Sequence, residues 1–117
     1  MRVPLRHAAH VRSGDKGNTA TISVIAYSDA LYPILVEQLT ADRFKGHYNG
    51  VIQGTVTRYD LDRLGALHFV AEEALGGGVS RSLNLDAYGK TLAGAILGFE
   101  LEVPDELAGE LRGLQLT

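Results

Sequence analysis

The run TATISVIAY at positions 19–27 constrains the fold more than any other feature of this chain. Its residues are β-branched or apolar almost throughout, which is typical of a central strand that is covered on both faces or nearly so. The preceding segment, residues 2–12, alternates instead, with Val3, Leu5 and Val11 on one face and arginines on the other. Alternation of this kind predicts a half-buried strand. We therefore expect a β-hairpin whose turn comprises residues 13–18.

Two helices are expected after this hairpin. Ser28 or Asp29 can cap the first helix, and Thr40 can cap a further short turn. The mostly apolar stripe of the first helix consists of Leu31, Ile34, Leu35, Gln38 and Leu39. Asp60 or Asp62 is expected to begin the second helix, which Gly76 would end. Its predicted buried face consists of Leu64, Leu67, His68, Ala71 and Leu75.

The remaining segments predict strands. Residues 51–59 form one of them, with Gly54 as a bulge, and residues 79–86 alternate as another. Residues 91–98 fit either a helix or a strand, whereas residues 97–103 alternate as a strand. The expected order is β-β-α-β-α-β-β. This order predicts an α+β two-layer sandwich, in which a mixed, mainly antiparallel sheet of about five strands carries two main helices on one face.

Length and composition limit the class of protein. The 117 residues fit one domain, which we place at residues 1–104, with an acidic tail at residues 105–117. The chain has no cysteine, which excludes disulfides and thiolate metal sites. No apolar run is long enough to span a bilayer, so we expect a cytoplasmic protein without a membrane partner.

Charge gives two further expectations. The net charge of −3 argues against nucleic acid as the main partner. Basic residues gather in positions 1–27 and acidic residues in positions 100–117. These two ends can attract each other within one chain or between chains, or they can be two separate solvated faces.

The histidines do not predict a metal site. His7 and His10 are three positions apart, and such positions point to opposite faces of a strand. His47 and His68 could join them only through the fold, and no acidic cluster accompanies them. We therefore expect no metal and no cofactor, and we expect His68 to be a hydrogen-bonded, partly buried histidine.

The hairpin turn is a candidate anion site. Gly14 and Gly17 permit positive φ, which can align backbone N–H groups into an anion-binding nest. Around them the candidate site comprises Arg12, Ser13, Asp15, Lys16 and Asn18. The alternative, which the residue pattern favours, is an ordinary glycine-rich hairpin with solvated charges. Ser13, His10 and Asp15 include the residue types of a hydrolase triad, but neighbours in one turn rarely reach that geometry.

A second glycine-rich loop lies at residues 76–82, GGGVSRS. Gly76 can serve as a helix cap, but Gly77 and Gly78 exceed what a cap requires. Alternation puts Arg81 on the same face as apolar neighbours, where an arginine requires a carboxylate, a path to water or an anionic ligand. We add Gly77, Gly78, Ser80 and Arg81 to the candidate anion site, which forms only if the two loops meet.

Three segments of the sequence resemble a known family. RSGDKGNTA, EEALGGGVSRSL and LEVP are similar to segments of the C-terminal domain of AtuA-type acyclic terpene utilisation proteins, and the resemblance extends from about Val3 to Pro104. It implies a ferredoxin-like fold and an association with breakdown of acyclic terpenes and branched acyl-CoA compounds. It implies no catalytic residue.

In that family the domain usually follows a much larger one on the same polypeptide. Because this sequence begins with its own Met1, we expect a small subunit that self-associates and docks to a separately encoded AtuA-like large domain. The alternative expectation is an enzyme or binding protein for an acyl-CoA or another phosphate or carboxylate ligand. In a third alternative, the two loops only lock a subunit interface.

Overall fold

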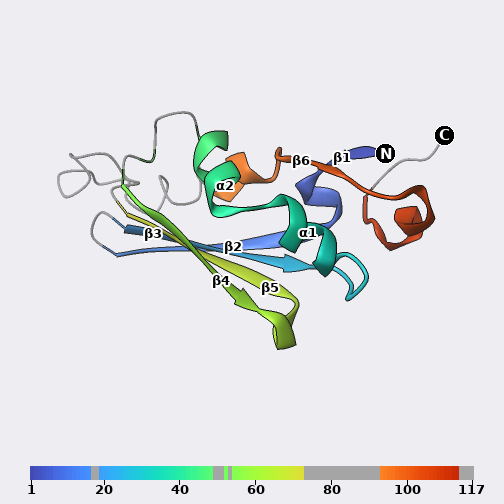
Figure 1. The fold of residues 1–117 in the computed structure, drawn as a ribbon, viewed down its shortest axis with the longest axis horizontal. Coiled ribbons are helices and arrows are strands. Elements are labelled where there is room, and N and C mark those ends of the chain that lie inside the picture. The colour runs from blue at the N-terminus through green and yellow to red at the C-terminus, as the bar shows by residue number, and fades with distance from the viewer. Residues whose placement is uncertain (17–18, 49–51, 53, 73–92, 114–117) are drawn as a thin grey trace.

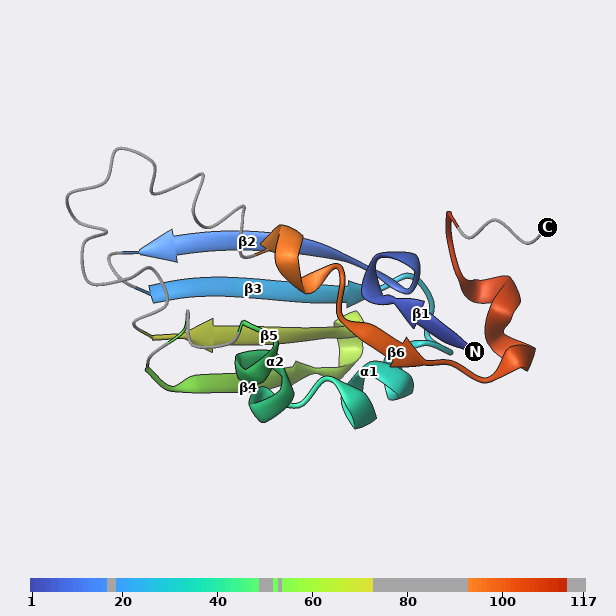
Figure 2. The same cartoon turned by 90° about the horizontal axis from the view of Figure 1, so that it is seen from above.

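The computed structural model describes residues 1–16, 19–48, 52, 54–72 and 93–113, and the structural statements below refer to these residues. Four strands form an antiparallel sheet in the order β2-β3-β5-β4. They are β2 (Ala9–Lys16), β3 (Thr19–Ala26), β5 (Ala66–Ala71) and β4 (Val56–Leu61). A second antiparallel pair, β1 (Arg2–Pro4) and β6 (Glu100–Glu102), lies with the helices on one side of that sheet (Figures 1 and 2). The predicted α+β two-layer architecture is confirmed.

The predicted hairpin is also confirmed, because β2 and β3 pair along their whole length from Ala9 opposite Ala26 to Lys16 opposite Thr19. The single strand expected over residues 2–12 is wrong, since η1 (Leu5–His7) separates β1 from β2. Pro4 has no N–H to donate to a ladder, so regular pairing ends there. The next two amides instead bind the chain before β6, where the Leu5 N–H donates to the Phe99 carbonyl at 2.7 Å.

Two short helices follow β3. In α1 (Tyr32–Gln38) the expected cap is wrong, since Leu31 holds the N-cap position without a side-chain hydrogen bond and Pro33 lies in the first turn. Proline suits this turn because its missing N–H has no partner there. In α2 (Ala41–His47) the predicted cap is confirmed: Thr40 Oγ1 accepts a hydrogen bond from the Arg43 N–H at 3.1 Å.

The helix expected after Asp60 is wrong. Residues 62–64 form the short turn η2 (Asp62–Leu64), and Gly65 at φ +60° turns the chain into strand β5. Leu67 and Phe69 point into the core, whereas His68 and Val70 lie half-buried on the other face. Within the described residues, one helical connection therefore joins strands of the sheet, β3–α1–α2–β4. Both β3 and β4 pair antiparallel with β5, so they run parallel to each other.

The C-terminal part returns over the sheet. Residues 93–96 are helical, and β6 confirms the strand predicted within residues 97–103. The strand predicted at residues 79–86 lies outside the described residues. After β6, the chain forms η4 (Asp105–Glu110), and Leu107 and Leu111 pack against the core. The boundary placed after residue 104 stays a prediction.

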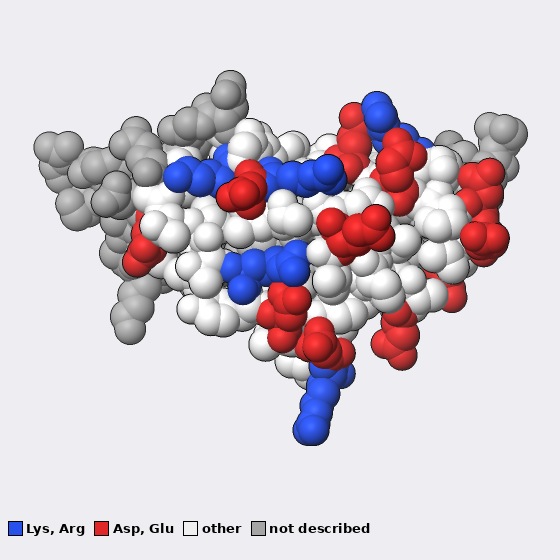
Figure 3. All heavy atoms as spheres, viewed as in Figure 1, with Lys and Arg blue, Asp and Glu red and all other residues white. Residues whose placement is uncertain are grey.

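The oppositely charged ends meet within one chain. Arg2 Nε lies 3.1 Å from Glu102 Oε1, and the terminal amine of Met1 lies 3.3 Å from Asp105 Oδ1. Figure 3 shows acidic side chains gathered at the end of the molecule that holds η4. Arg2, Glu102 and Asp105 are largely exposed and Met1 is partly exposed, so each pair contributes at most about 1 kcal/mol.

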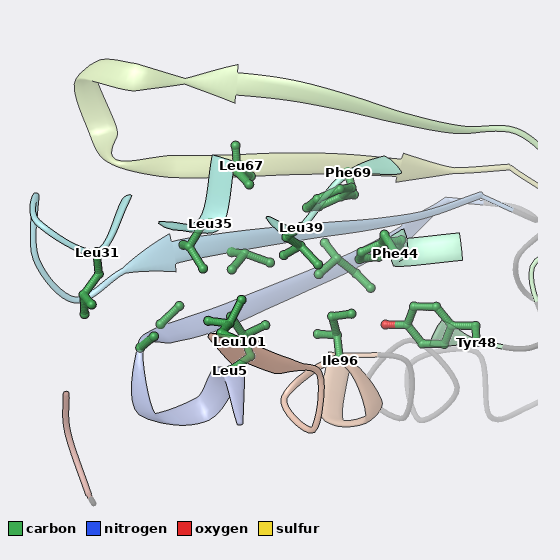
Figure 4. Close-up of a cluster of buried hydrophobic side chains, with 14 of the residues drawn as sticks. Leu5, Leu31, Leu35, Leu39, Phe44, Tyr48, Leu67, Phe69, Ile96 and Leu101 are labelled. Carbon is green, nitrogen blue, oxygen red and sulfur yellow. The ribbon is translucent and has the colours of Figure 1, made fainter. Parts of the chain in front are cut away.

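The core lies between the four-stranded sheet and the layer formed by α1, α2, β1 and β6 (Figure 4). Phe69 of β5 stacks on Phe44 of α2, with ring centroids 4.2 Å apart. Leu35 and Leu39 come from the helical connection and Leu101 from β6, and all are fully buried. Burial also raises the pKa of the Tyr48 hydroxyl beside this cluster. Each such side chain contributes about 1.5–3 kcal/mol, which fixes the helices on this face of the sheet.

Candidate functional site

Strand β2 contains most of the residues expected in the hairpin turn. Arg12, Ser13, Gly14, Asp15 and Lys16 all pair with β3, so the turn expected over residues 13–18 is shorter than predicted. The other candidate residues lie outside the described residues: Gly17, Asn18, Gly77, Gly78, Ser80 and Arg81. The meeting of the two glycine-rich loops therefore stays a prediction.

Gly14 has a steric role instead of the expected conformational one. It lies in the strand opposite Thr21, and among the described glycines only Gly65 and Gly113 adopt positive φ. A Cβ atom at Gly14 would lie 2.8 Å from Thr21 Oγ1, closer than real contacts allow. The glycine thus makes room for the threonine hydroxyl, and it does not itself provide the left-handed residue that an anion nest requires.

One face of the four-stranded sheet points away from α1, α2, β1 and β6 (Figures 1 and 2). We call it the open face. Strand alternation and the register assign its side chains. They are His10, Arg12, Gly14, Thr19, Thr21, Ser23, Ile25, Thr57, Tyr59, Leu61, Ala66, His68 and Val70. The open face thus carries His10 and Arg12 on β2, and Thr57, Tyr59 and Leu61 on β4.

A polar row crosses the middle of the open face. The register aligns Arg12 with Ser23, Ser23 with His68, and His68 with Tyr59, one residue from each strand. The Ser23 hydroxyl and His68 Nδ1 are hydrogen-bonded at 2.7 Å, and the rings of His68 and Tyr59 lie 6.5 Å apart. We call these four residues the central row.

Sequence reasoning missed part of this row. The hydrogen-bonded, partly buried state predicted for His68 is confirmed, although His68 lies on a strand and not on a helix. Ser23 and Tyr59 were not singled out. Alternation in ALHFVA after Gly65 is the signal that would have placed His68 opposite them.

The other histidines have structural partners. His7 Nδ1 donates to the Arg112 carbonyl at 2.8 Å, and His47 Nε2 donates to the Ala95 carbonyl at 2.8 Å. His10 stacks on Tyr27, and the Arg112 guanidinium lies 4.4 Å from the centre of the same tyrosine ring. In the described part of the chain, no group of three or more histidines or carboxylates is placed to hold a metal ion.

The acidic residues expected to begin a helix instead have partners around β4. Asp60 Oδ1 lies 2.8 Å from Arg58 Nε, and Arg58 Nη1 donates to the carbonyls of Val36 and Leu39 at the end of α1. Asp62 Oδ1 accepts a hydrogen bond from the Tyr32 hydroxyl at 2.6 Å. Burial, followed by this bond and the Asp62 charge, raises the pKa of Tyr32 to about 12. These contacts connect α1 to the sheet.

The described residues form an open surface groove of about 430 Å³ between α1 and β6, which is lined by Met1, Ile34, Glu37, Gln38, Glu102, Val103 and Pro104. A second hollow is apolar and lies at the β4–β5 turn, beside Leu61 and Leu64. Tyr59, Leu61 and Leu64 are 52%, 38% and 70% exposed. We call these three residues the apolar patch.

The family comparison agrees with this fold. The family model described as the AtuA ferredoxin-like domain matches residues 3–102 of the 117. No curated protein and no solved structure matches the chain. No helix in the described segments has the length and apolar character needed to cross a membrane.

Proposed function

Because this chain belongs to the AtuA ferredoxin-like domain family, we propose that it is an accessory domain that docks to a larger AtuA-like domain. In this proposal the assembly takes part in the breakdown of acyclic terpenes or related branched acyl-CoA compounds. The chain supplies a binding surface, and it also self-associates. The observation that carries the proposal is the apolar patch beside the open face.

The composition of that patch supports docking. Large apolar side chains are seldom left exposed as a contiguous group in a monomer, and such groups mark interaction sites. Leu64 is 70% exposed and Tyr59 52% exposed, and Leu61 lies between them in sequence on the same hairpin. Tyrosine is one of the residue types enriched among the few side chains that account for most of the binding energy in protein interfaces, so Tyr59 is the expected anchor of this patch.

Calorimetric titration of the full chain against an AtuA-like large domain tests the docking. Wild-type protein is expected to bind at micromolar concentration, and Leu61→Asp with Leu64→Asp is expected to weaken binding at least about tenfold. The Arg6→Asp variant is the control, because it also adds acidic charge but lies in η1, in the opposite layer. No binding at micromolar protein, or equal loss in both variants, contradicts the proposal.

Light scattering after size exclusion tests self-association separately. The wild-type chain is expected to run as an oligomer at micromolar concentration. A monomer at every concentration contradicts this part of the proposal and leaves docking to be decided by the titration.

Anion binding by the two glycine-rich loops is the second candidate function. Its support is Arg12, which is exposed and belongs to none of the three ion pairs formed by described residues. A thermal-shift titration with CoA esters is expected to stabilise the wild-type chain and not Arg81→Ala, since stabilisation grows with site occupancy. No shift at millimolar ester contradicts this function.

A further inference from the structure

We propose that the central row of the open face binds a small oxyanion, the carboxylate of an organic acid with an apolar tail. Arg12, Ser23 and His68 hold the carboxylate, and Tyr59 contacts the tail. This inference goes beyond the docking function and does not depend on it, since one isolated chain carries every group involved.

The Ser23–His68 bond prepares one side of the site. It occupies Nδ1 of the imidazole, at 2.7 Å from the serine oxygen, and leaves Nε2 available to a ligand. When the serine hydroxyl donates to Nδ1, the ring carries its proton on Nε2 and can donate it outward. Both side chains are half-buried within the sheet face, so their orientation is held by neighbouring side chains.

Arg12 supplies the positive charge on the other side. Neighbouring strands lie about 4.8 Å apart, so roughly 10 Å separates the backbones of Arg12 and His68, with Ser23 between them. A carboxylate above Ser23 is therefore within reach of both side chains. A guanidinium binds a carboxylate through two parallel hydrogen bonds, which gives orientation as well as attraction.

Gly14 leaves space beside Arg12. It is the next residue of β2 on the open face, and it faces the Thr21 hydroxyl, with which any added Cβ would clash. The strand surface beside Arg12 therefore carries no side chain at Gly14 and presents the Thr21 hydroxyl. An oxyanion can approach there without displacing a side chain.

The other end of the row determines the class of ligand. Beyond His68 lies Tyr59, and beside Tyr59 on the open face of β4 lies Leu61; both are exposed. A ligand that is charged at one end and apolar at the other matches this change from basic to apolar along the row. Inorganic phosphate matches only the Arg12 end, so we infer a carboxylate with an aliphatic tail.

NMR titration of the full chain with hexanoate tests the inference. Hexanoate is expected to shift the backbone amides of Arg12, Ser23 and His68 in a saturable manner. Arg12→Gln and His68→Gln are each expected to raise the dissociation constant at least tenfold. Arg6→Gln, which removes the same charge from the opposite layer, is expected to leave it unchanged. The amide spectrum of each variant shows whether it is folded, and the exposed Arg12 can be replaced without loss of a core contact.

Three results would overturn the inference. The first is a titration with no saturable shifts in the central row. The second is equal weakening by Arg12→Gln and Arg6→Gln, which would mean nonspecific charge attraction. The third is inorganic phosphate binding as tightly as hexanoate, which would refute the apolar tail.

Discussion

At the scale of single residues, close backbone approach explains Gly54 better than conformational freedom does. Gly54 was expected to be a bulge, and its N–H donates to the Glu72 carbonyl at 3.0 Å beside the β4–β5 pair. A Cβ there would lie 2.4 Å from that carbonyl oxygen. Gly46 of α2 is the opposite case, because a Cβ there would meet nothing within 4 Å.

These two glycines give opposite predictions for the same substitution. Gly54→Ala is expected to lower the free energy of unfolding by about 1–3 kcal/mol, because two backbones must move apart. Gly46→Ala is expected to raise it by about 0.5–1 kcal/mol, since alanine restricts the unfolded chain. Urea unfolding of both variants measures the difference. A neutral Gly54→Ala would contradict the close approach.

The raised pKa of Tyr32 predicts that the stability of the protein depends on pH in the alkaline range. Its folded pKa of about 12 lies above the ordinary value of 10, so its contribution to stability is complete below pH 10 and is lost as pH rises through 12. The free energy of unfolding of wild type is therefore expected to exceed that of Tyr32→Phe below pH 10, and this difference is expected to disappear as the pH rises to 12. Urea unfolding at a series of pH values measures it, and a constant difference between the two proteins would refute the assignment.

At the scale of elements, a side chain completes the edge of β6. The Gln38 amide donates to the Glu102 carbonyl at 2.7 Å and accepts from the Glu102 N–H at 2.8 Å, as a neighbouring strand would. Strand β6 therefore has β1 on one edge and a residue of α1 on the other. This contact connects the helical segment to the two-stranded sheet.

Gln38→Ala is expected to reduce stability by about 0.5–1.5 kcal/mol, because it removes two exposed hydrogen bonds to the Glu102 backbone and leaves these groups to water. Hydrogen exchange of the Glu102 amide is expected to accelerate more than that of amides in β3. Glu37→Ala is the matched control, since Glu37 is the preceding residue of α1 and is exposed. Equal exchange rates in the two variants would contradict the role given to Gln38.

The elements also show how far the sequence could predict this fold. The β2–β3 hairpin was predictable because β-branched residues and alternation agree in that segment. Strand β5 was not, because Leu64, Leu67, His68 and Ala71 match the spacing of a helical stripe while both faces of the strand carry apolar or half-buried groups. Gly65 decides between the two alternatives through its positive φ, which only the structure reveals.

Because residues 66–71 were expected to be helical, the central row could not be predicted from the sequence. With residues 66–71 placed in a helix, His68 could not be aligned with Ser23 and Tyr59. The row depends on cross-strand register, and register depends on turn geometry that the chain specifies through the fold as a whole. Arg12 and Gly14 were identified from the sequence, but both residues lie in strand β2 and not in a turn.

At the scale of the whole molecule, the two faces of the four-stranded sheet differ, because one is covered by other elements and the other is the open face. Helices α1 and α2, with β1 and β6, cover one side of the sheet and bury the core (Figure 2). The apolar patch and the central row lie on or beside the other side. We propose that this open side is the binding surface of the domain.

Methyl NMR of the full chain, titrated with an AtuA-like large domain, tests that claim most directly. We predict that the largest shift changes occur at the methyl groups of Ile25, Leu61, Leu64 and Val70, on or beside the open face. Shift changes confined to Ile34 and Val103, which line the groove between α1 and β6, would contradict the claim, as would a spectrum that does not change.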